Sequence, residues 1–193
     1  MQMKRTDAPL AGLVDLSPPP ADPVPLDEID LALLRLLAQD ARASQRSLAR
    51  ELGMSAPAIG ERLARMERTG VIRGYSVVVD WGAAGFPVVI YLAITTAQGH
   101  DLGPVMAEMN RLPEVENLTV VTGDLDLLVR LRVRDYAHLR SMLLEKVWQI
   151  SGVQRTETYL SIAEGPPKNF VADLLSSART NDAAAGSPRG EMA

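Results

Sequence analysis

The sequence predicts an α+β fold of two domains, a helical N-terminal domain and a C-terminal domain with the element order βαββαβ. Two patterns predict this division. Up to residue 70, apolar residues recur at three- and four-residue steps, which is typical of helices; after residue 88, β-branched or alternating runs are interspersed with helical ones. Between them, residues 80–87 are rich in glycine and indicate a hinge, so a linker strand and hinge are expected at 77–87.

Composition narrows the class of protein. A chain of 193 residues can hold one large or two small domains. The absence of cysteine excludes disulfides and thiolate zinc sites and suits a reducing cytoplasm. No apolar run approaches the length of a membrane span, and the first residues lack the layout of a signal peptide. We therefore expect a cytoplasmic protein that does not enter a membrane.

The N-terminal domain is expected at residues 26–76. Residues 1–25 before it are rich in proline and are expected to be a disordered leader. Asp27 is placed to cap the first helix. The buried stripe of that helix repeats at helical spacing and consists of Ile29, Leu33, Leu36 and Leu37.

The next segment has the spacing of a helix-turn-helix. Such a motif needs a small residue where its helices cross and a residue that tolerates φ > 0 at the turn, and Ala49 and Gly53 meet these needs. Ile59 and Leu63, one turn apart, can pack the second helix on the first. Residues 71–75 and 77–79 read as extended, so we predict a winged helix-turn-helix with a strand leaving it.

Charge favours a DNA-binding motif over an ordinary αα-hairpin. Residues 42–75 carry seven arginines and three glutamates, a net +4, whereas residues 85–165 carry seven basic and ten acidic residues, a net −3. Arg62 and Arg65 lie three apart, opposite the apolar face of the second helix, although a solvated helix face would look the same. The candidate DNA-contacting residues are Ser55, Ala56, Pro57, Gly60, Glu61, Arg62, Arg65, Arg73 and Tyr75.

The C-terminal domain is expected at residues 88–164. Its predicted elements are strands at 88–96, 115–122, 126–133 and 153–162 and helices at 101–109 and 136–150. This order is that of the ferredoxin-like split βαβ fold. Two helices would cover one face of the sheet, and the other face would be bare and apolar enough to need a partner, so we expect a homodimer.

Signs of an enzyme are missing from the sequence. No nucleophile–base set, phosphate loop or metal cluster is evident, so we expect no catalytic residue, no metal and no cofactor. His100 and His138 are isolated and are expected at the surface. Asp124 and Asp126 straddle one residue of a turn, where they could bind a metal, act as an acid–base pair or simply shape a hairpin. A small-molecule binder or an assembly protein without specific DNA function remains the alternative class.

The chain resembles the Lrp/AsnC, or feast/famine, family of leucine-responsive regulators over residues 26–164. The motifs that carry the resemblance are LDEID at 26–30, LARELGMS at 48–55, RLARMERTGVI at 62–72, LPEV at 112–115, VTGDLD at 121–126 and SGVQRTET at 151–158. The resemblance implies a transcriptional regulator that binds double-stranded DNA and whose dimers assemble further into tetramers or octamers. It also implies an effector, an amino acid, bound at an oligomer interface by Thr122, Gly123, Asp124, Leu125, Asp126 and Thr156.

Two residues depart from the family pattern. Gly60 stands where a polar or basic residue is more usual, which reduces the expected base readout. Leu125 replaces a more usual aromatic residue, which leaves the identity of the effector open. Residues 1–25 and 165–193 lie outside the resemblance, and the C-terminal extension is expected to be mostly disordered.

Overall fold

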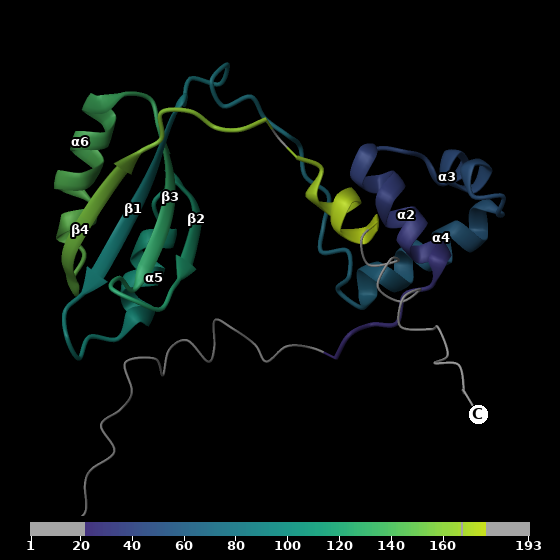
Figure 1. The fold of residues 1–193 in the computed structure, drawn as a ribbon, viewed down its shortest axis with the longest axis horizontal. Coiled ribbons are helices and arrows are strands. Elements are labelled where there is room, and N and C mark those ends of the chain that lie inside the picture. The colour runs from purple at the N-terminus through teal and green to yellow at the C-terminus, as the bar shows by residue number, and fades with distance from the viewer. Residues whose placement is uncertain (1–21, 167, 177–193) are drawn as a thin grey trace, which may run out of the picture. The chain divides into compact units, whose positions relative to one another are not determined.

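The structure, a computed structural model, describes residues 22–166 and 168–176 and divides the chain into two compact units (Figure 1). The helical unit spans residues 22–77 and also takes in the described part of the chain after Gly165; the sheet unit spans residues 78–164. The elements are α2 (Glu28–Gln39), α3 (Gln45–Glu51), α4 (Ala56–Arg68), β1 (Val88–Thr96), α5 (Leu102–Asn110), β2 (Val115–Val120), β3 (Leu127–Val133), α6 (Tyr136–Glu145), the 3-10 helix η1 (Val147–Gln149) and β4 (Val153–Leu160). Most of the predicted leader, and the chain after Ser176, lie outside the described residues.

Helix α2 begins with a reciprocal cap. The Asp27 carboxylate accepts hydrogen bonds from the backbone N–H groups of Ile29 and Asp30, and Asp30 Oδ2 accepts one from the Asp27 N–H at 3.0 Å. Such a box satisfies backbone donors that a helix otherwise leaves open at its start. The core beneath it is built from Leu33, Leu48, Ala49, Ile59, Leu63 and Met66.

The turn between α3 and α4 has the predicted geometry. Gly53 adopts φ +62°, and the next residue, Met54, donates its N–H to Ala49 O at 2.9 Å. Ser55 caps α4 by accepting from Ala58 N–H at 3.3 Å. Ala49 is 5% exposed, as a close crossing of two helices requires. The helix-turn-helix prediction is confirmed.

The segment after α4 differs from the prediction. No strand forms between residues 69 and 87, although 71–79 read as extended. Val77 and Val78 are 84% and 98% exposed, so their side chains pack on nothing in this chain. A strand needs a neighbour to accept and donate its backbone hydrogen bonds, and the described residues of this chain supply none for this segment.

The described part of the C-terminal extension belongs to the helical unit. Residues 170–176 are helical. Asn169 Oδ1 accepts from Ala172 N–H at 3.1 Å, which caps this short helix, and Asn169 Nδ2 donates to Ala38 O at 3.0 Å. Because Ala38 lies in the last turn of α2, no backbone N–H of that helix donates to its carbonyl oxygen. The extension therefore caps the C-terminal end of α2.

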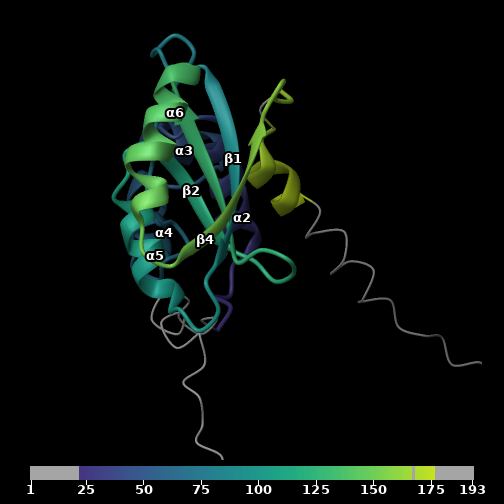
Figure 2. The same ribbon diagram turned by 90° about the vertical axis from the view of Figure 1, so that its left-hand side faces the viewer.

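The sheet unit has the predicted ferredoxin-like topology. Its four antiparallel strands lie in the order β2-β3-β1-β4, with Leu92 of β1 opposite Val129 of β3 and Thr158 of β4. Helices α5 and α6 cover the same face of the sheet (Figure 2). The alternating burial of β3 confirms the period-2 pattern of its sequence. The core between the helices and the sheet includes Ile90, Leu92, Ile94, Leu127, Val129, Leu131, Met109 and Met142.

The uncovered face of the sheet carries ion pairs among apolar and aromatic side chains. Arg132 Nε contacts Glu116 Oε2 at 2.7 Å, Arg130 Nε contacts the same oxygen at 3.2 Å, and both arginines also pair with Glu164. The Arg130 guanidinium lies 5.9 Å from the centre of the Tyr91 ring. The face is therefore not uniformly apolar as expected, because outward positions of β2 and β3 carry these ions beside the apolar and aromatic residues of β1 and β4.

Two negative findings, on membrane-spanning helices and on metal-binding clusters, apply to the described residues only. No helix there is both long and apolar enough to cross a membrane. No cluster of three or more histidine, aspartate or glutamate side chains is arranged there to hold a metal ion.

Gly152, before β4, provides a test of the packing between β4 and α5. Gly152 adopts φ +95°, and an added Cβ would meet His100 Cδ2 at 2.9 Å and Val105 Cγ2 at 3.1 Å. Gly99 adopts φ +83° with open space around it. We predict that Gly99→Ala costs about 1 kcal/mol of unfolding free energy through backbone strain. Gly152→Ala should cost about 1–3 kcal/mol more through overpacking. Urea midpoints at an unchanged slope measure both, and equal costs would contradict the packing described.

Candidate functional site

The outer side of α4 presents few polar side chains. Pro57 and Glu61 are exposed, while Ala56 is partly buried and Ser55 is occupied as the cap. Gly60 faces the other way, because a Cβ at this residue would meet Gln45 Oε1 of α3 at 3.1 Å. A side chain at this position would therefore crowd the exposed end of the Gln45 side chain, a contact with α3 that the base-readout argument did not consider.

Arg62 and Arg65 of α4 join this helix to the start of α2. Arg62 Nη1 lies 2.6 Å from Asp27 Oδ2 and 2.8 Å from Asp30 Oδ1. Arg65 Nη2 pairs with Asp30 Oδ2, and Arg65 Nη1 donates to Pro25 O at 3.4 Å. The Asp30 side chain is 1% exposed, so its charge is buried between two guanidinium groups. These contacts form what we call the Asp30 clamp: Asp27, Asp30, Arg62 and Arg65.

The clamp shifts the proton affinities of its exposed members. The backbone N–H of Asp30, and then Arg62, lower the pKa of Asp27. In turn, hydrogen bonds to Asp27 and Asp30 raise the pKa of Arg62. Because the folded pKa of Asp27 is lowered, its contribution to stability is present above its unfolded pKa and is lost as pH falls through the folded value.

The clamp leaves some donors free for DNA. Both ion pairs of Arg62 use Nη1, so its Nη2 and Nε groups have no partner among the described residues. The side chains of Arg62 and Arg65 are 25% and 37% exposed. DNA contact by these two arginines stays a prediction, to which the structure adds a role in holding α4 on α2.

The two candidates after α4 differ in their contacts. Tyr75 Oη donates to Glu67 Oε1 at 3.0 Å. Partial burial, and then the hydrogen bond to Glu67, raise the pKa of Tyr75. Arg73 is exposed and has no partner among the described residues.

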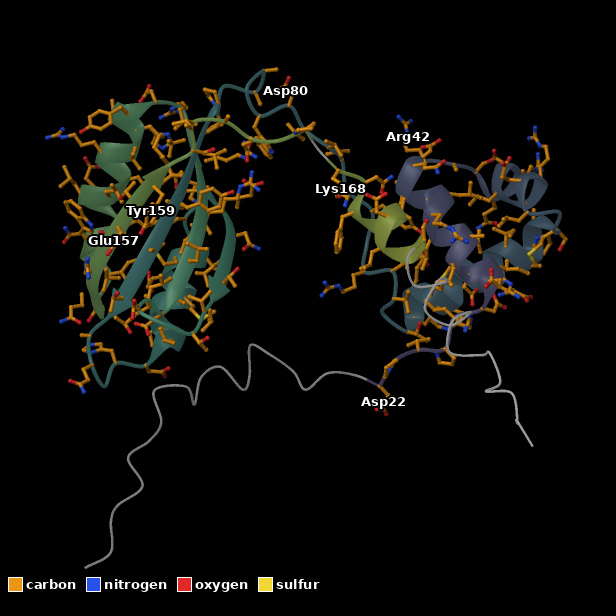
Figure 3. The ribbon with its side chains drawn as sticks, in the orientation of Figure 1. Asp22, Arg42, Asp80, Glu157, Tyr159 and Lys168 are labelled. Carbon is orange, nitrogen blue, oxygen red and sulfur yellow. The ribbon has the colours of Figure 1, made fainter. Side chains whose placement is uncertain are left out.

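Sequence reasoning counted four other arginines of the helical unit in its charge balance but did not include them among the candidate DNA-contacting residues. They are exposed, and the described residues offer them no acid; they are Arg42, Arg46, Arg50 and Arg68. Arg42 projects from the turn after α2 (Figure 3). The signal that could have found two of them is the four-residue spacing of Arg46 and Arg50 on α3. With Arg73, these five cations give the helical unit its capacity to bind phosphate.

The predicted effector turn lies at the β2–β3 end of the sheet. Gly123 adopts φ +131° there, which favours glycine. Asp126 Oδ2 accepts from Thr96 N–H at 2.7 Å and from Thr96 Oγ1 at 2.8 Å, so this carboxylate fixes the end of β1. Asp124 is exposed, and its carboxylate has no donor among the described residues. Of the two carboxylates, only that of Asp124 has no hydrogen-bond partner among the described residues.

The other predicted effector residues lie at the same end of the sheet. Thr122 is exposed and Leu125 is partly buried within the turn. Thr156 of β4 is opposite Ile94, whose other neighbour is Leu127 of β3, so Thr156 lies two strands from the turn. Its Oγ1 accepts from Trp148 Nε1 at 3.0 Å.

A second cavity, at the other end of the sheet, was not predicted. This β2–α6 pocket has a volume of about 730 Å³, and its lining is made of Trp81, Phe86, Pro113, Glu114, Val115, Glu116, Arg132, Arg134, His138, Ser141, Met142 and Lys146. The acidic and basic residues among them lie far apart in sequence, and the LPEV motif at 112–115, which contributes three lining residues, gave no sign by itself that it borders a pocket. The glycine and two aspartates of the motif at 121–126 drew attention to the turn at the opposite end instead.

A buried carboxylate organises one wall of this pocket. Glu114 Oε1 accepts from Lys146 Nζ at 2.8 Å and lies 3.1 Å from His138 Nε2. Because His138 Nδ1 accepts from Arg134 N–H at 3.3 Å, Nε2 carries the proton and donates to Glu114. Burial acts to raise the pKa of Glu114, but the hydrogen bonds from Lys146 and His138 outweigh it and the net pKa is lowered. The expected surface position of His138 was wrong: its side chain is 13% exposed.

Two family models match the chain over most of the described residues. Residues 26–73 match a winged helix-turn-helix DNA-binding model, and residues 89–166 match the Lrp/AsnC ligand binding domain.

Two curated relatives match this chain over most of their own length. A protein of Pyrococcus abyssi, named an uncharacterized HTH-type transcriptional regulator, is 38% identical over 135 residues, which are 70% of this chain and 85% of the relative. The leucine-responsive regulatory protein of Haemophilus influenzae is 31% identical over 150 residues, which are 76% of this chain and 89% of that protein.

Solved structures share the fold. Escherichia coli AsnC aligns with a TM-score of 0.72 at 24% identity, covering 77% of this chain and 99% of that one. A transcriptional regulator of Neisseria meningitidis, solved as a complex with L-Met, aligns with a TM-score of 0.71 at 20% identity, covering 74% and 94% of the two chains.

The Asp30 clamp predicts a large effect for a single acid. We expect Asp30→Ala to lower the unfolding free energy by about 2–3 kcal/mol, because two guanidinium groups lose their shared partner; access of both arginines to water limits the cost. Glu51→Ala, at an exposed acid of α3, should change it by less than about 0.5 kcal/mol. Urea unfolding followed by helical circular dichroism measures both. Similar midpoints for the two variants would show that the clamp contributes little.

Proposed function

Since the chain belongs to the Lrp/AsnC family of transcriptional regulators, we propose that it binds specific double-stranded DNA through its helical unit and responds to an amino acid bound by its sheet unit. The observation that carries the DNA-binding half is the helix-turn-helix beside five unpaired arginines. A helix-turn-helix places its second helix in the major groove, which here is α4. The arginines at its flanks then meet the phosphates on either side.

In this proposal, different residues of α4 and its cap contact different parts of the DNA. The N-terminal turn of α4, from Ser55 to Pro57, approaches the base edges, because small side chains there allow close contact. Arg62 keeps Nη2 and Nε for a base or phosphate while Nη1 holds the clamp. Glu61 is exposed between them and can accept a hydrogen bond from cytosine.

Salt dependence tests the role of the free arginines. We predict that Arg68→Gln and Arg73→Gln each weaken binding to all DNA sequences and each reduce the slope of log affinity against log salt by about one. Arg140→Gln, which removes an exposed arginine of the sheet unit, is the matched control and should leave the slope unchanged. Fluorescence anisotropy with operator and random duplexes at several salt concentrations measures this. A protein that shows no salt-dependent DNA binding at all would be a ligand-binding or assembly protein instead.

The effector half of the proposal rests on the chemistry of the turn. An amino acid carries an ammonium group and a carboxylate, so its site needs an acceptor and donors close together. Asp124 offers a free carboxylate, and Gly123 leaves the backbone N–H groups of the turn accessible. Amino acids are also the natural probes because a regulator of this fold, from Neisseria meningitidis, was solved with L-Met.

We further propose that the effector acts by changing assembly. The turn is at an exposed corner of the sheet unit, where a second subunit can approach it. A ligand held by two subunits binds the assembled state more tightly than the separate one, so it shifts the equilibrium towards assembly. The expected species are homodimers that associate into tetramers or octamers.

A substitution at the turn separates this role from folding. We predict that Asp124→Ala keeps the thermal midpoint and DNA affinity of the parent protein but loses the change in oligomer size caused by the cognate amino acid. Light scattering with each of the twenty amino acids, first on the parent and then on the variant, measures this. Asp126→Ala is the contrasting variant and should lower the thermal midpoint, because Thr96 loses two hydrogen bonds. A normal ligand response in Asp124→Ala would mean that the effector binds elsewhere.

A further inference from the structure

The β2–α6 pocket is large enough for a small organic ligand. Its volume of about 730 Å³ lies within the range of ligand sites in proteins. It is bounded by the starts of β1 and β2, the end of β3 and one side of α6, whereas the Thr122–Asp126 turn lies at the opposite end of the same strands. The pocket is therefore separate from the proposed effector turn.

The polar side of the pocket has an excess of positive charge. Lys146 is balanced by Glu114 at 2.8 Å, and Arg132 is balanced by Glu116 at 2.7 Å. The Arg134 guanidinium has no acid or other acceptor among the described residues, so it is the uncompensated charge of the lining. An arginine can bind a carboxylate through two parallel hydrogen bonds, which makes an anion of this kind its preferred partner.

Aromatic and apolar side chains also line the pocket, next to these polar groups. Trp81 lies against Arg132, whose guanidinium carbon is 5.9 Å from the ring centre, and Phe86 lies 6.5 Å from the His138 ring. Val115 and Met142 also line the pocket. Trp81 remains 41% exposed, which is unusual for so large an apolar side chain and leaves ring surface for a ligand to cover.

The Glu114 network holds the polar groups in place. The Glu114 side chain is 7% exposed and fixes both Lys146 and His138. His138 in turn accepts from the backbone N–H of Arg134, so the residue bearing the free charge is tied to the same network. Glu114 is accordingly a positioning residue for this pocket, and preorganised polar groups reduce the entropy that a ligand must lose on binding.

From this arrangement we propose that the β2–α6 pocket is a second small-molecule site, which binds a monocarboxylate with an aromatic or bulky apolar body. The carboxylate pairs with Arg134, near Lys146, and the apolar body lies against Trp81 and Phe86. The inference does not depend on DNA binding or on the effector turn, since occupancy of the pocket is measured directly.

The two tryptophans of the chain allow a direct test. They are Trp81, in the pocket, and Trp148, which lies outside it. In full-length protein with Trp148→Phe, tryptophan fluorescence comes from Trp81 alone. Titration at constant ionic strength compares three probes: 3-phenylpropanoate, 2-phenylethylamine, which has a similar shape and the opposite charge, and acetate, which has the carboxylate alone.

We expect 3-phenylpropanoate to change Trp81 fluorescence in a saturable way, with the amine and acetate at least about tenfold weaker. Adding Arg134→Gln should weaken 3-phenylpropanoate about tenfold or more, while Arg140→Gln, on the same helix as His138 but outside the pocket, should leave it unchanged. Asp124→Ala should also leave it unchanged, which separates this site from the effector turn. Thermal midpoints of all variants establish that each is folded.

Three results with the Trp148→Phe protein and its Arg134→Gln derivative would overturn the proposal. They are the absence of saturable binding of 3-phenylpropanoate, equal or tighter binding of the amine, and unchanged affinity in a folded Arg134→Gln variant. Loss of binding in Asp124→Ala would instead place the ligand at the turn and would likewise overturn it. None of these results bears on whether the helical unit binds DNA.

Discussion

The helical unit depends on one buried carboxylate. Asp30 is 1% exposed and lies between the guanidinium groups of Arg62 and Arg65, while its second role is to close the cap of α2. A buried charge is tolerated only when it is paired and hydrogen-bonded, so the two arginines must stay where Asp30 can reach them. This requirement fixes α4 against the start of α2. The orientation of the helix that the motif presents to DNA therefore follows from an ion pair as well as from apolar packing.

The clamp also determines which charges remain for DNA. Arg62 and Arg65 use some of their guanidinium donors for hydrogen bonds to Asp30. Three other arginines have no acidic partner among the described residues: Arg46 and Arg50 of α3, and Arg73 after α4. Phosphate contacts from such flanking cations fix the position of a protein on the duplex but carry no sequence information. In the proposed DNA complex, base readout then falls on a short, mostly small-residue stretch at the start of α4.

The two ligand sites proposed for the sheet unit lie at opposite ends of its strands. At one end, Asp126 is used to hold β1 and β3 together, which leaves Asp124 free beside it. At the other end, Glu114 gathers Lys146 and His138 around a cavity whose remaining charge is that of Arg134. Ion pairs of Arg130 and Arg132 lie on the uncovered face between the two ends. A partner on that face must therefore match charges as well as cover the exposed aromatic rings.

The sequence by itself determined the elements and the turn chemistry, because these depend on residues close together along the chain. Helical spacing around Leu33, the glycine at 53 and the alternation of β3 each report on local geometry. Only the tertiary structure decided which charges are paired, because the partners lie far apart: Arg62 is 35 residues from Asp27, and His138 is 24 residues from Glu114. The same reason explains the strand that did not form at 77–79, since a strand is completed by a neighbour and not by its own sequence.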